Sequence, residues 1–182
     1  MIAYKAFEPG LICRGYQFVM GLNQTEQANC RANGFHCAEN PLDCLSYYPD
    51  MAKSEFYLVK TGGDIDEDGD DTKIACTELA IIRKLTQEEF FLHGLAFMVN
   101  RPKREWSSHV KKDRAQATRG YAVVRGIDPV ARGGLGDILA FAKEDMTGAT
   151  VSHISLARVD GIKVLPDLWY GVDLNERQVL AL

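Results

Sequence analysis

The sequence has no hydrophobic run close to the roughly 20 residues that a membrane-spanning helix needs. Its first residues show no basic head followed by an apolar stretch, so no secretory signal is expected. Its five cysteines are an odd number and include no CxxC pair. These absences predict a cytoplasmic protein with reduced thiols and no membrane partner.

Catalytic signatures are also missing. The chain contains no glycine-rich phosphate loop, no HExxH zinc motif, no GxSxG elbow and no recognisable Cys/His nucleophile signature. The spacing of Cys30, His36 and Cys37 is not a standard zinc arrangement. The sequence therefore predicts no resident metal and no cofactor, and it favours a protein that is not an enzyme.

The 182 residues are 46% hydrophobic and 25% charged, which is typical of a folded chain with one or two domains. The net charge of −4 argues against a polycation built for nucleic acid. Charge is unevenly spread, because residues 1–90 carry 8 basic against 15 acidic side chains and residues 91–182 carry 13 against 10. Such polarity predicts two surfaces with different partners, or two parts that attract each other.

These patterns predict an α+β domain over residues 1–100, a basic linker or arm over 101–118 and an all-β, Ala/Gly-rich part over 119–182. A hairpin around Pro9-Gly10 is expected to join the first two strands. The expected strands of the first part cover 2–7, 11–19, 35–38, 56–60 and 73–85. The expected helices cover 23–32, 42–48 with Asn40 as N-cap, and 90–99 after a Thr86-x-x-Glu89 capping box.

The C-terminal part has its own texture. Alanine and glycine recur at short spacings over 115–136, which predicts tightly stacked turns, as in a fragment of a β-solenoid. A hairpin is expected from 138–143 and 149–158, with final strands at 168–170 and 179–182. Unpaired edges of these strands make a homodimer a reasonable expectation.

An acidic segment is the sharpest local motif, and it offers a surface for a basic partner. Its members are Asp64, Asp66, Glu67, Asp68, Asp70 and Asp71. Asp64, Asp66 and Asp68 also match the start of a calcium loop, but Ala75 stands where the bidentate glutamate belongs. Calcium binding is thus a weaker alternative, beside a solvated acidic turn.

A basic segment follows, and it suits contacts with a protein or with DNA or RNA backbone phosphates. Trp106 would stack on a base. The segment's members are Arg101, Lys103, Arg104, Trp106, Lys111, Lys112, Arg114 and Arg119. The alternative is a solvated linker that docks on the acidic segment.

One enzyme-like arrangement is present. Arg14 in the first hairpin, His36 in a short strand, Tyr48 at the end of a helix and Glu78 in a later strand loosely resemble the layout of ADP-ribosyltransferases. The resemblance covers about half the chain. It implies an NAD-using enzyme in which Arg14 or His36 grips NAD, Tyr48 faces the nicotinamide and Glu78 polarises the ribose.

A wider resemblance rests on residues 1–7, 11–18 and 34–43 and on the C-terminal stretches 159–163 and 166–170. These segments resemble an uncharacterised accessory protein family of phages and prophages of gut Firmicutes. In size and style the chain is also similar to Clostridium-type anti-CRISPR inhibitors of type II systems. That resemblance implies a viral protein in the cytoplasm of the bacterial host.

The leading hypothesis is therefore a counter-defence protein that binds Cas9, alone or with its guide RNA, and blocks target DNA binding or cleavage. Either charged segment suits this role, because Cas9 has a positively charged channel and carries nucleic acid. The alternatives are the ADP-ribosyltransferase-like enzyme and a structural phage module.

Overall fold

The computed structural model describes residues 1–29, 33–67 and 72–179. Within these ranges no helix is both long and apolar enough to cross a membrane. The chain divides into two compact units, Met1–Phe90 and Phe91–Leu182. Each unit is described by itself below.

The protein is predominantly β, so the prediction of an α+β fold is wrong. Strands make up 51% of it and helices 12%. The described residues hold two helices, the 3-10 helix η1 (Pro41–Ser46) and the α-helix α1 (Gln87–Asn100). The division between the two units falls inside α1.

The helix expected over residues 23–32 accounts for part of this error. Gly21–Gln24 forms strand β4, the described residues 25–29 contain no helix, and residues 30–32 lie outside the described part. Strand β4 pairs antiparallel with β7 (Lys73–Leu85), where Asn23 stands opposite Leu79. Long-range pairing has thus overridden a local sequence that is compatible with a helix.

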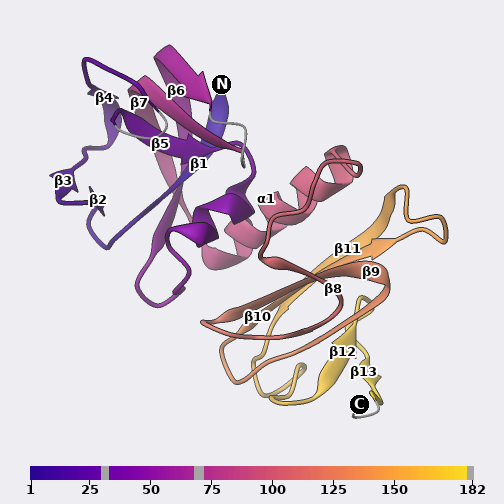
Figure 1. Ribbon diagram of the computed structural model, residues 1–182. Coiled ribbons are helices and arrows are strands. Elements are labelled where there is room, and N and C mark those ends of the chain that lie inside the picture. The colour runs from indigo at the N-terminus through magenta and orange to yellow at the C-terminus, as the bar shows by residue number, and fades with distance from the viewer. Residues whose placement is uncertain (30–32, 68–71, 180–182) are drawn as a thin grey trace. The chain divides into compact units, whose positions relative to one another are not determined.

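The N-terminal unit is a closed ring of strand pairings in the order β7-β5-β1-β6-β7, with β4 added along β7 (Figure 1). The remaining ring strands are β1 (Ile2–Phe7), β5 (Phe35–Ala38) and β6 (Glu55–Glu67). The predictions for residues 2–7, 35–38 and 73–85 are confirmed, whereas β6 extends well beyond the predicted 56–60.

Residues 11–19 do not form the second strand of a hairpin with β1. They hold two short strands, β2 (Ile12–Cys13) and β3 (Tyr16–Gln17), which pair with each other around Arg14-Gly15. Both turn residues have positive φ, 50° and 78°, as a type I′ turn requires. The full-length partner of β1 is β6, so the hairpin prediction is wrong about the pairing.

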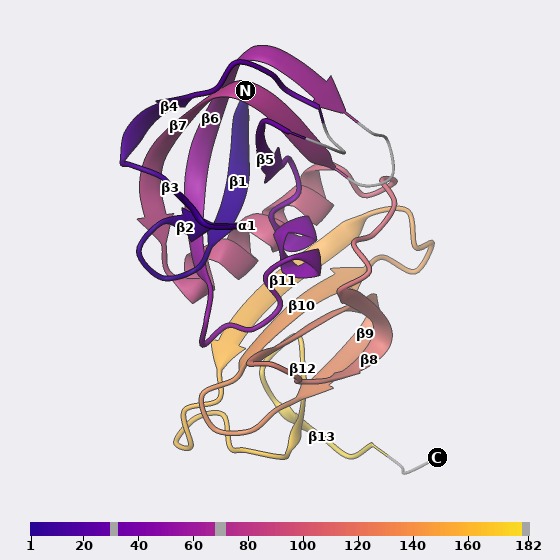
Figure 2. The ribbon, with the colours of Figure 1, turned by 60° about the vertical axis from the view of Figure 1, so that its left-hand side comes forward.

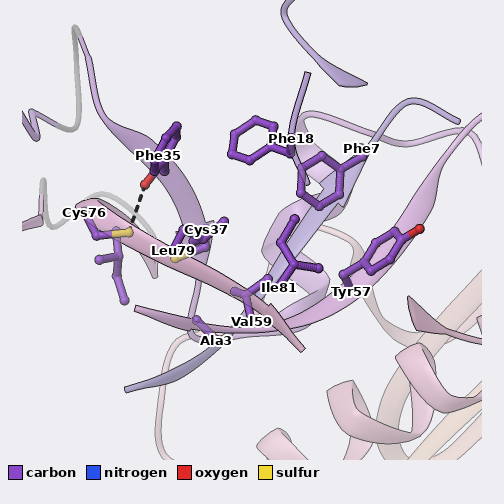
Figure 3. Close-up of a cluster of buried hydrophobic side chains, with 11 residues drawn as sticks. Ala3, Phe7, Phe18, Phe35, Cys37, Tyr57, Val59, Cys76, Leu79 and Ile81 are labelled. Carbon is purple, nitrogen blue, oxygen red and sulfur yellow. Dashed lines mark hydrogen bonds between the residues drawn. The ribbon is translucent and has the colours of Figure 1, made fainter. Parts of the chain in front are cut away.

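The core of the N-terminal unit is aromatic on one side (Figure 3). The rings of Phe7 and Phe18 meet edge-on at 5.1 Å, and the rings of Phe7 and Tyr57 do so at 5.4 Å. In Figure 3 the thiol of Cys76 donates a hydrogen bond to the carbonyl of Phe35 on the neighbouring strand. This packing holds β1, the β2–β3 hairpin and β5 together.

The predicted capping box is confirmed at the start of α1. The Thr86 hydroxyl accepts from the Glu89 amide at 3.1 Å, and the Glu89 carboxylate accepts from the Thr86 amide at 2.9 Å. The next turn places Phe90 stacked on Phe56, with ring centroids 3.9 Å apart. The cap therefore fixes where the helix begins.

Replacing Thr86 with alanine is expected to lower the free energy of unfolding by about 1 kcal/mol, because two helix-terminal amides lose this reciprocal arrangement. Urea unfolding followed by circular dichroism measures the change. Thr25→Ala, at an exposed threonine outside any helix, is the control. Equal stabilities for the two variants would contradict the assignment of the cap.

The C-terminal unit is a six-stranded sheet in the order β11-β10-β9-β12-β13, with β8 paired to β9 (Figure 2). Its strands are β8 (Val110–Gln116), β9 (Tyr121–Arg132), β10 (Ile138–Glu144), β11 (Val151–Arg158), β12 (Trp169–Gly171) and β13 (Glu176–Arg177). The hairpin of β10 and β11 is confirmed. Of the last predicted strand, 179–182, residues 180–182 lie outside the described part.

Strands β8, β9 and β10 run parallel although they are consecutive in the chain. Parallel neighbours normally need a long crossover, but only residues 117–120 join β8 to β9. The chain instead turns within the strands, because residues 126–129 stand opposite Asp113 alone. At Gly126 a Cβ atom would lie 2.1 Å from the Asp113 carboxylate and 3.2 Å from the Asp113 Cα, so a larger residue would require Asp113 to shift. This arrangement agrees with the stacked turns that the small residues predict.

Candidate functional site

A cavity of about 520 Å³ lies within the N-terminal unit. Strands β1 and β5 and helix η1 supply most of its lining residues, and the β2–β3 hairpin and the first residue of β7 supply others. Figure 2 shows the backbone of these elements. Its polar lining residues are Lys5, Glu8, Cys13, Arg14, His36, Cys37, Asp43, Cys44, Tyr47, Tyr48 and Lys73. These side chains come from five separate segments of the chain.

Lys5 is the most unusual of them, because its side chain is charged and the residue is only 4% exposed. Its ammonium donates to the carbonyl of His36 at 2.7 Å and to the Cys13 sulfur at 3.7 Å. It also lies 5.1 Å from the ring centres of both Phe7 and Phe18. No carboxylate in the described part of the chain forms an ion pair with it. Among the described residues, the charge of this buried cation is balanced by dipoles and ring faces.

Two further cations lie around the cavity. Arg14 is exposed at the tip of the β2–β3 hairpin. The Lys73 ammonium donates to the Tyr47 hydroxyl at 3.3 Å and lies 5.7 Å from the centre of that ring. The cavity therefore combines one buried and two more accessible positive charges.

The two carboxylates of the lining form no ion pair with Lys5. Asp43 accepts hydrogen bonds from the Thr72 amide at 3.2 Å and from the Thr72 hydroxyl at 2.7 Å, which ties it to the start of β7. Glu8 is exposed just beyond the end of β1. The cavity consequently favours an anion over a cation.

Two other polar groups of the lining, Tyr48 and Cys37, have a raised pKa. Burial, and next the neighbouring Cys13, raise the pKa of the Tyr48 phenol. The hydrogen bond with Cys76, and next burial, raise the pKa of the Cys37 thiol. Cys44 donates its thiol hydrogen to the carbonyl of Tyr4 at 3.5 Å. These groups add hydrogen-bonding capacity to the cavity without adding negative charge.

Three of the four residues predicted for an ADP-ribosyltransferase-like site, Arg14, His36 and Tyr48, line this one cavity. The fourth, Glu78, does not, because its carboxylate accepts from the Gln24 side chain at 3.1 Å. Glu78 lies in the middle of β7, whereas the cavity touches that strand only at its first residue, Lys73. The structure therefore does not bring the predicted four residues together.

Sequence reasoning missed Lys5, Cys13, Tyr47 and Lys73 as lining residues. One signal for Lys5 was available, since the alternation of β1 places it between Ala3 and Phe7 on the face that enters the core. A lysine on the apolar face of a strand is rarely buried unless it is paired, so such a lysine is a candidate binding residue. No comparable local signal singles out Tyr47 or Lys73.

The acidic segment lies elsewhere in the same unit. Asp64, Asp66 and Glu67 are exposed on the end of β6, and Asp68, Asp70 and Asp71 lie outside the described residues. The Asp64 amide donates to the Thr77 hydroxyl at 2.9 Å, and Asp66 pairs with Ala75. Asp66 thus sits in a paired part of β6, whereas Asp64 lies in the irregularity between Gly62 and Ile65. The described residues contain no grouping of three or more metal-ligating side chains.

Of the three zinc candidates, only two lie within the described residues. His36 and Cys37 are neighbours in β5, and Cys30 lies outside the described residues.

The basic segment was predicted to be a linker or a free arm. In the structure it belongs to the C-terminal unit. Residues 110–116 of it form strand β8. Lys111 donates to the Ser108 carbonyl at 3.2 Å, and the Arg101 guanidinium lies 4.6 Å from the Phe97 ring centre. The remaining exposed cations are Lys103, Arg104, Lys112, Arg114 and Arg119. Phosphate contacts through these exposed cations stay a prediction.

Trp106 is not presented as an open stacking platform. The Arg125 guanidinium lies 4.6 Å from the Trp106 ring centre and covers one face of the half-buried ring. Arg125 itself is 1% exposed, and its Nε donates to the Glu144 carboxylate at 2.8 Å. Trp169 is likewise approached by Arg114 and Arg132, at 5.1 and 4.9 Å. These contacts point to structural roles for both tryptophans.

No curated protein and no solved structure matches the chain. A family model described as a domain of unknown function, DUF7666, matches residues 1–93, which include every residue that lines the cavity. Because the match spans half of the 182 residues, the chain belongs to the DUF7666 family.

Proposed function

We propose that the N-terminal domain binds a small anionic molecule in its cavity, with the Lys5 ammonium holding the anionic group. The observation that carries the proposal is the burial of Lys5 without a carboxylate partner in the described residues. An ammonium has three donor hydrogens, and the bonds to the His36 carbonyl and the Cys13 sulfur use two of them. One donor is left for a ligand.

The free-energy argument supports the same conclusion. Removing an ammonium from water costs several kcal/mol, about as much as the whole effect of several ordinary hydrogen bonds. An anion paired with Lys5 would offset that cost, and no carboxylate of the described residues pairs with it. Arg14 and Lys73 extend the positive field toward the opening, where it attracts an anion from solution.

Calorimetric titration of the full chain with inorganic pyrophosphate tests the proposal. Wild-type protein is expected to bind it, and Lys5→Met is expected to abolish binding because the side-chain volume stays and the charge goes. Lys60→Met, at an exposed lysine of β6 outside the cavity, is the matched control and is expected to bind like wild type. Binding that is absent from wild type, or equal in wild type and Lys5→Met, would refute the proposal.

A second variant separates binding from folding at the tip of the β2–β3 hairpin. Arg14 has φ 50°, a conformation that costs a long side chain about 1 kcal/mol and suits asparagine in a type I′ turn. Arg14→Asn is therefore expected to raise the free energy of unfolding by about 0.5–1 kcal/mol. The same change is expected to weaken pyrophosphate binding about tenfold, because one charged donor is lost.

Thermal unfolding and calorimetry on the same Arg14→Asn preparation measure both effects. A variant that is less stable and binds pyrophosphate as tightly as wild type would show that Arg14 serves the fold rather than the ligand.

Inhibition of Cas9 stays a prediction from the resemblance of the sequence, and it concerns a macromolecular partner rather than the cavity. A cleavage assay tests it, with the protein added before or after guide loading and before or after target binding. Inhibition in any order would support a counter-defence role, and the order would locate the blocked step. Inactivity against Cas9 proteins from several species would end that hypothesis.

A further inference from the structure

The opening of the cavity carries an aromatic pair that an anion-binding role does not explain. Tyr47 and Tyr48 are consecutive residues at the end of η1, and both line the cavity. Tyr48 is half-buried beside Cys13, whereas Tyr47 is 49% exposed. Half of a large amphipathic ring is thus left in water at the edge of a binding cavity, where a planar ligand group would cover it.

The volume of the cavity is also larger than a simple anion requires. Sites for small organic ligands have about 300–1,000 Å³, and the 520 Å³ here falls within that range. Apart from its charged groups, the lining includes Ala6, Ala38 and the protonated thiols of Cys37 and Cys44. This part of the wall suits an uncharged, mostly apolar portion of a ligand.

Charge orients such a ligand. The buried cation, Lys5, lies on β1 against the aromatic core, and the exposed carboxylate of Glu8 lies beyond the end of that strand. A phosphate is attracted to Lys5 and repelled by Glu8, whereas a neutral ring has no net charge that either residue would attract or repel. Tyr47 stands in contact with the Lys73 ammonium, so its ring is held in place before a ligand arrives.

We propose that the ligand is a nucleoside phosphate, with its phosphate at Lys5 and its base stacked on Tyr47. This inference rests on the proposed function and names the substrate class of the same cavity. Base stacking on an aromatic side chain tolerates any of the four bases, because every base has a π-face. Tyr47 therefore sets the preference for a nucleotide over a bare anion rather than for one base.

The test compares ADP, GDP, CDP and UDP with inorganic pyrophosphate by calorimetric titration of the full chain. At least one nucleotide is expected to bind about tenfold or more tightly than pyrophosphate, the effect of one stacked base. Tyr47→Ala is expected to remove that advantage and to leave the affinity for pyrophosphate unchanged. Tyr16→Ala, at a tyrosine that is also 49% exposed but does not line the cavity, is the matched control.

The outcomes separate the two proposals. If pyrophosphate binds through Lys5 and no nucleotide binds more tightly, the nucleotide inference is wrong and the anion site stands. If neither pyrophosphate nor any nucleotide binds in a Lys5-dependent manner, both proposals fail. A nucleotide advantage that survives Tyr47→Ala would also overturn the inference, since the base would then lie elsewhere.

Discussion

Lys5→Met is expected to yield a ligand-free protein that is more stable than wild type and that pyrophosphate no longer stabilises. Methionine keeps the length and volume of the buried stem and removes the charge. Replacing buried charged groups by apolar ones of similar volume is neutral or stabilises proteins by about 1–4 kcal/mol. The lost hydrogen bond to the His36 carbonyl opposes this gain by about 1 kcal/mol. We therefore expect a net gain of up to about 2 kcal/mol.

Thermal unfolding with and without pyrophosphate measures both parts of this prediction. Wild-type protein is expected to gain stability as pyrophosphate rises above its dissociation constant, by about 2.7 kcal/mol at a hundredfold excess. Lys60→Met is expected to match wild type in both measurements. If the unfolding temperature of ligand-free Lys5→Met is well below that of wild type, Lys5 is a structural residue that the fold needs. The interpretation that Lys5 lowers stability in favour of binding is then excluded.

Glu144→Gln is expected to destabilise the C-terminal unit by about 3–5 kcal/mol, because it leaves the buried Arg125 charge without a partner. The Arg125 side chain is 2% exposed, and its Nε lies 2.8 Å from the Glu144 carboxylate. Its NH2 group donates to the Pro102 carbonyl at 2.8 Å, and its flat face lies on Trp106. Glutamine keeps the shape of Glu144 and loses the charge, so the experiment isolates the electrostatic part.

Urea unfolding followed by tryptophan fluorescence reports this change, since Trp106 contacts Arg125. Glu105→Gln, an identical substitution at an exposed glutamate of the same unit, is the control and is expected to change stability by less than about 0.5 kcal/mol. The double variant Arg125→Met/Glu144→Leu is expected to recover most of the loss, because both buried charges are then gone. A loss below about 1 kcal/mol for Glu144→Gln would mean that water reaches the pair and screens it.

These two predictions have opposite signs for a physical reason. Arg125 is a buried cation with a carboxylate, a carbonyl and a ring around it, so the protein itself satisfies it. Lys5 is a buried cation with a carbonyl, a thiol and two rings, and no carboxylate in the described residues pairs with it. Removing the partner of Arg125 is therefore expected to destabilise the fold, whereas removing the Lys5 charge is expected to affect only the proposed binding.

Local sequence determined the features of this protein that depend on near neighbours. The alternation over residues 2–7 and the apolar run over 73–85 predict strands that the structure contains, because side-chain direction repeats every two residues. The Thr86–Glu89 cap and the hairpin of β10 and β11 follow from contacts a few residues apart. Small residues over 115–136 predict the close stacking of β8, β9 and β10 for the same reason.

Tertiary structure alone decided the rest. A helix was predicted over residues 23–32, yet Asn23 and Gln24 belong to a strand that pairs with β7 more than fifty positions away. The cavity gathers Lys5, Arg14, His36, Tyr47 and Lys73 from separate elements, while Glu78 faces another neighbour. Burial turns Lys5 from an ordinary strand lysine into the centre of the proposed site, because the energy of a charge depends on everything packed around it and not on its neighbours in sequence.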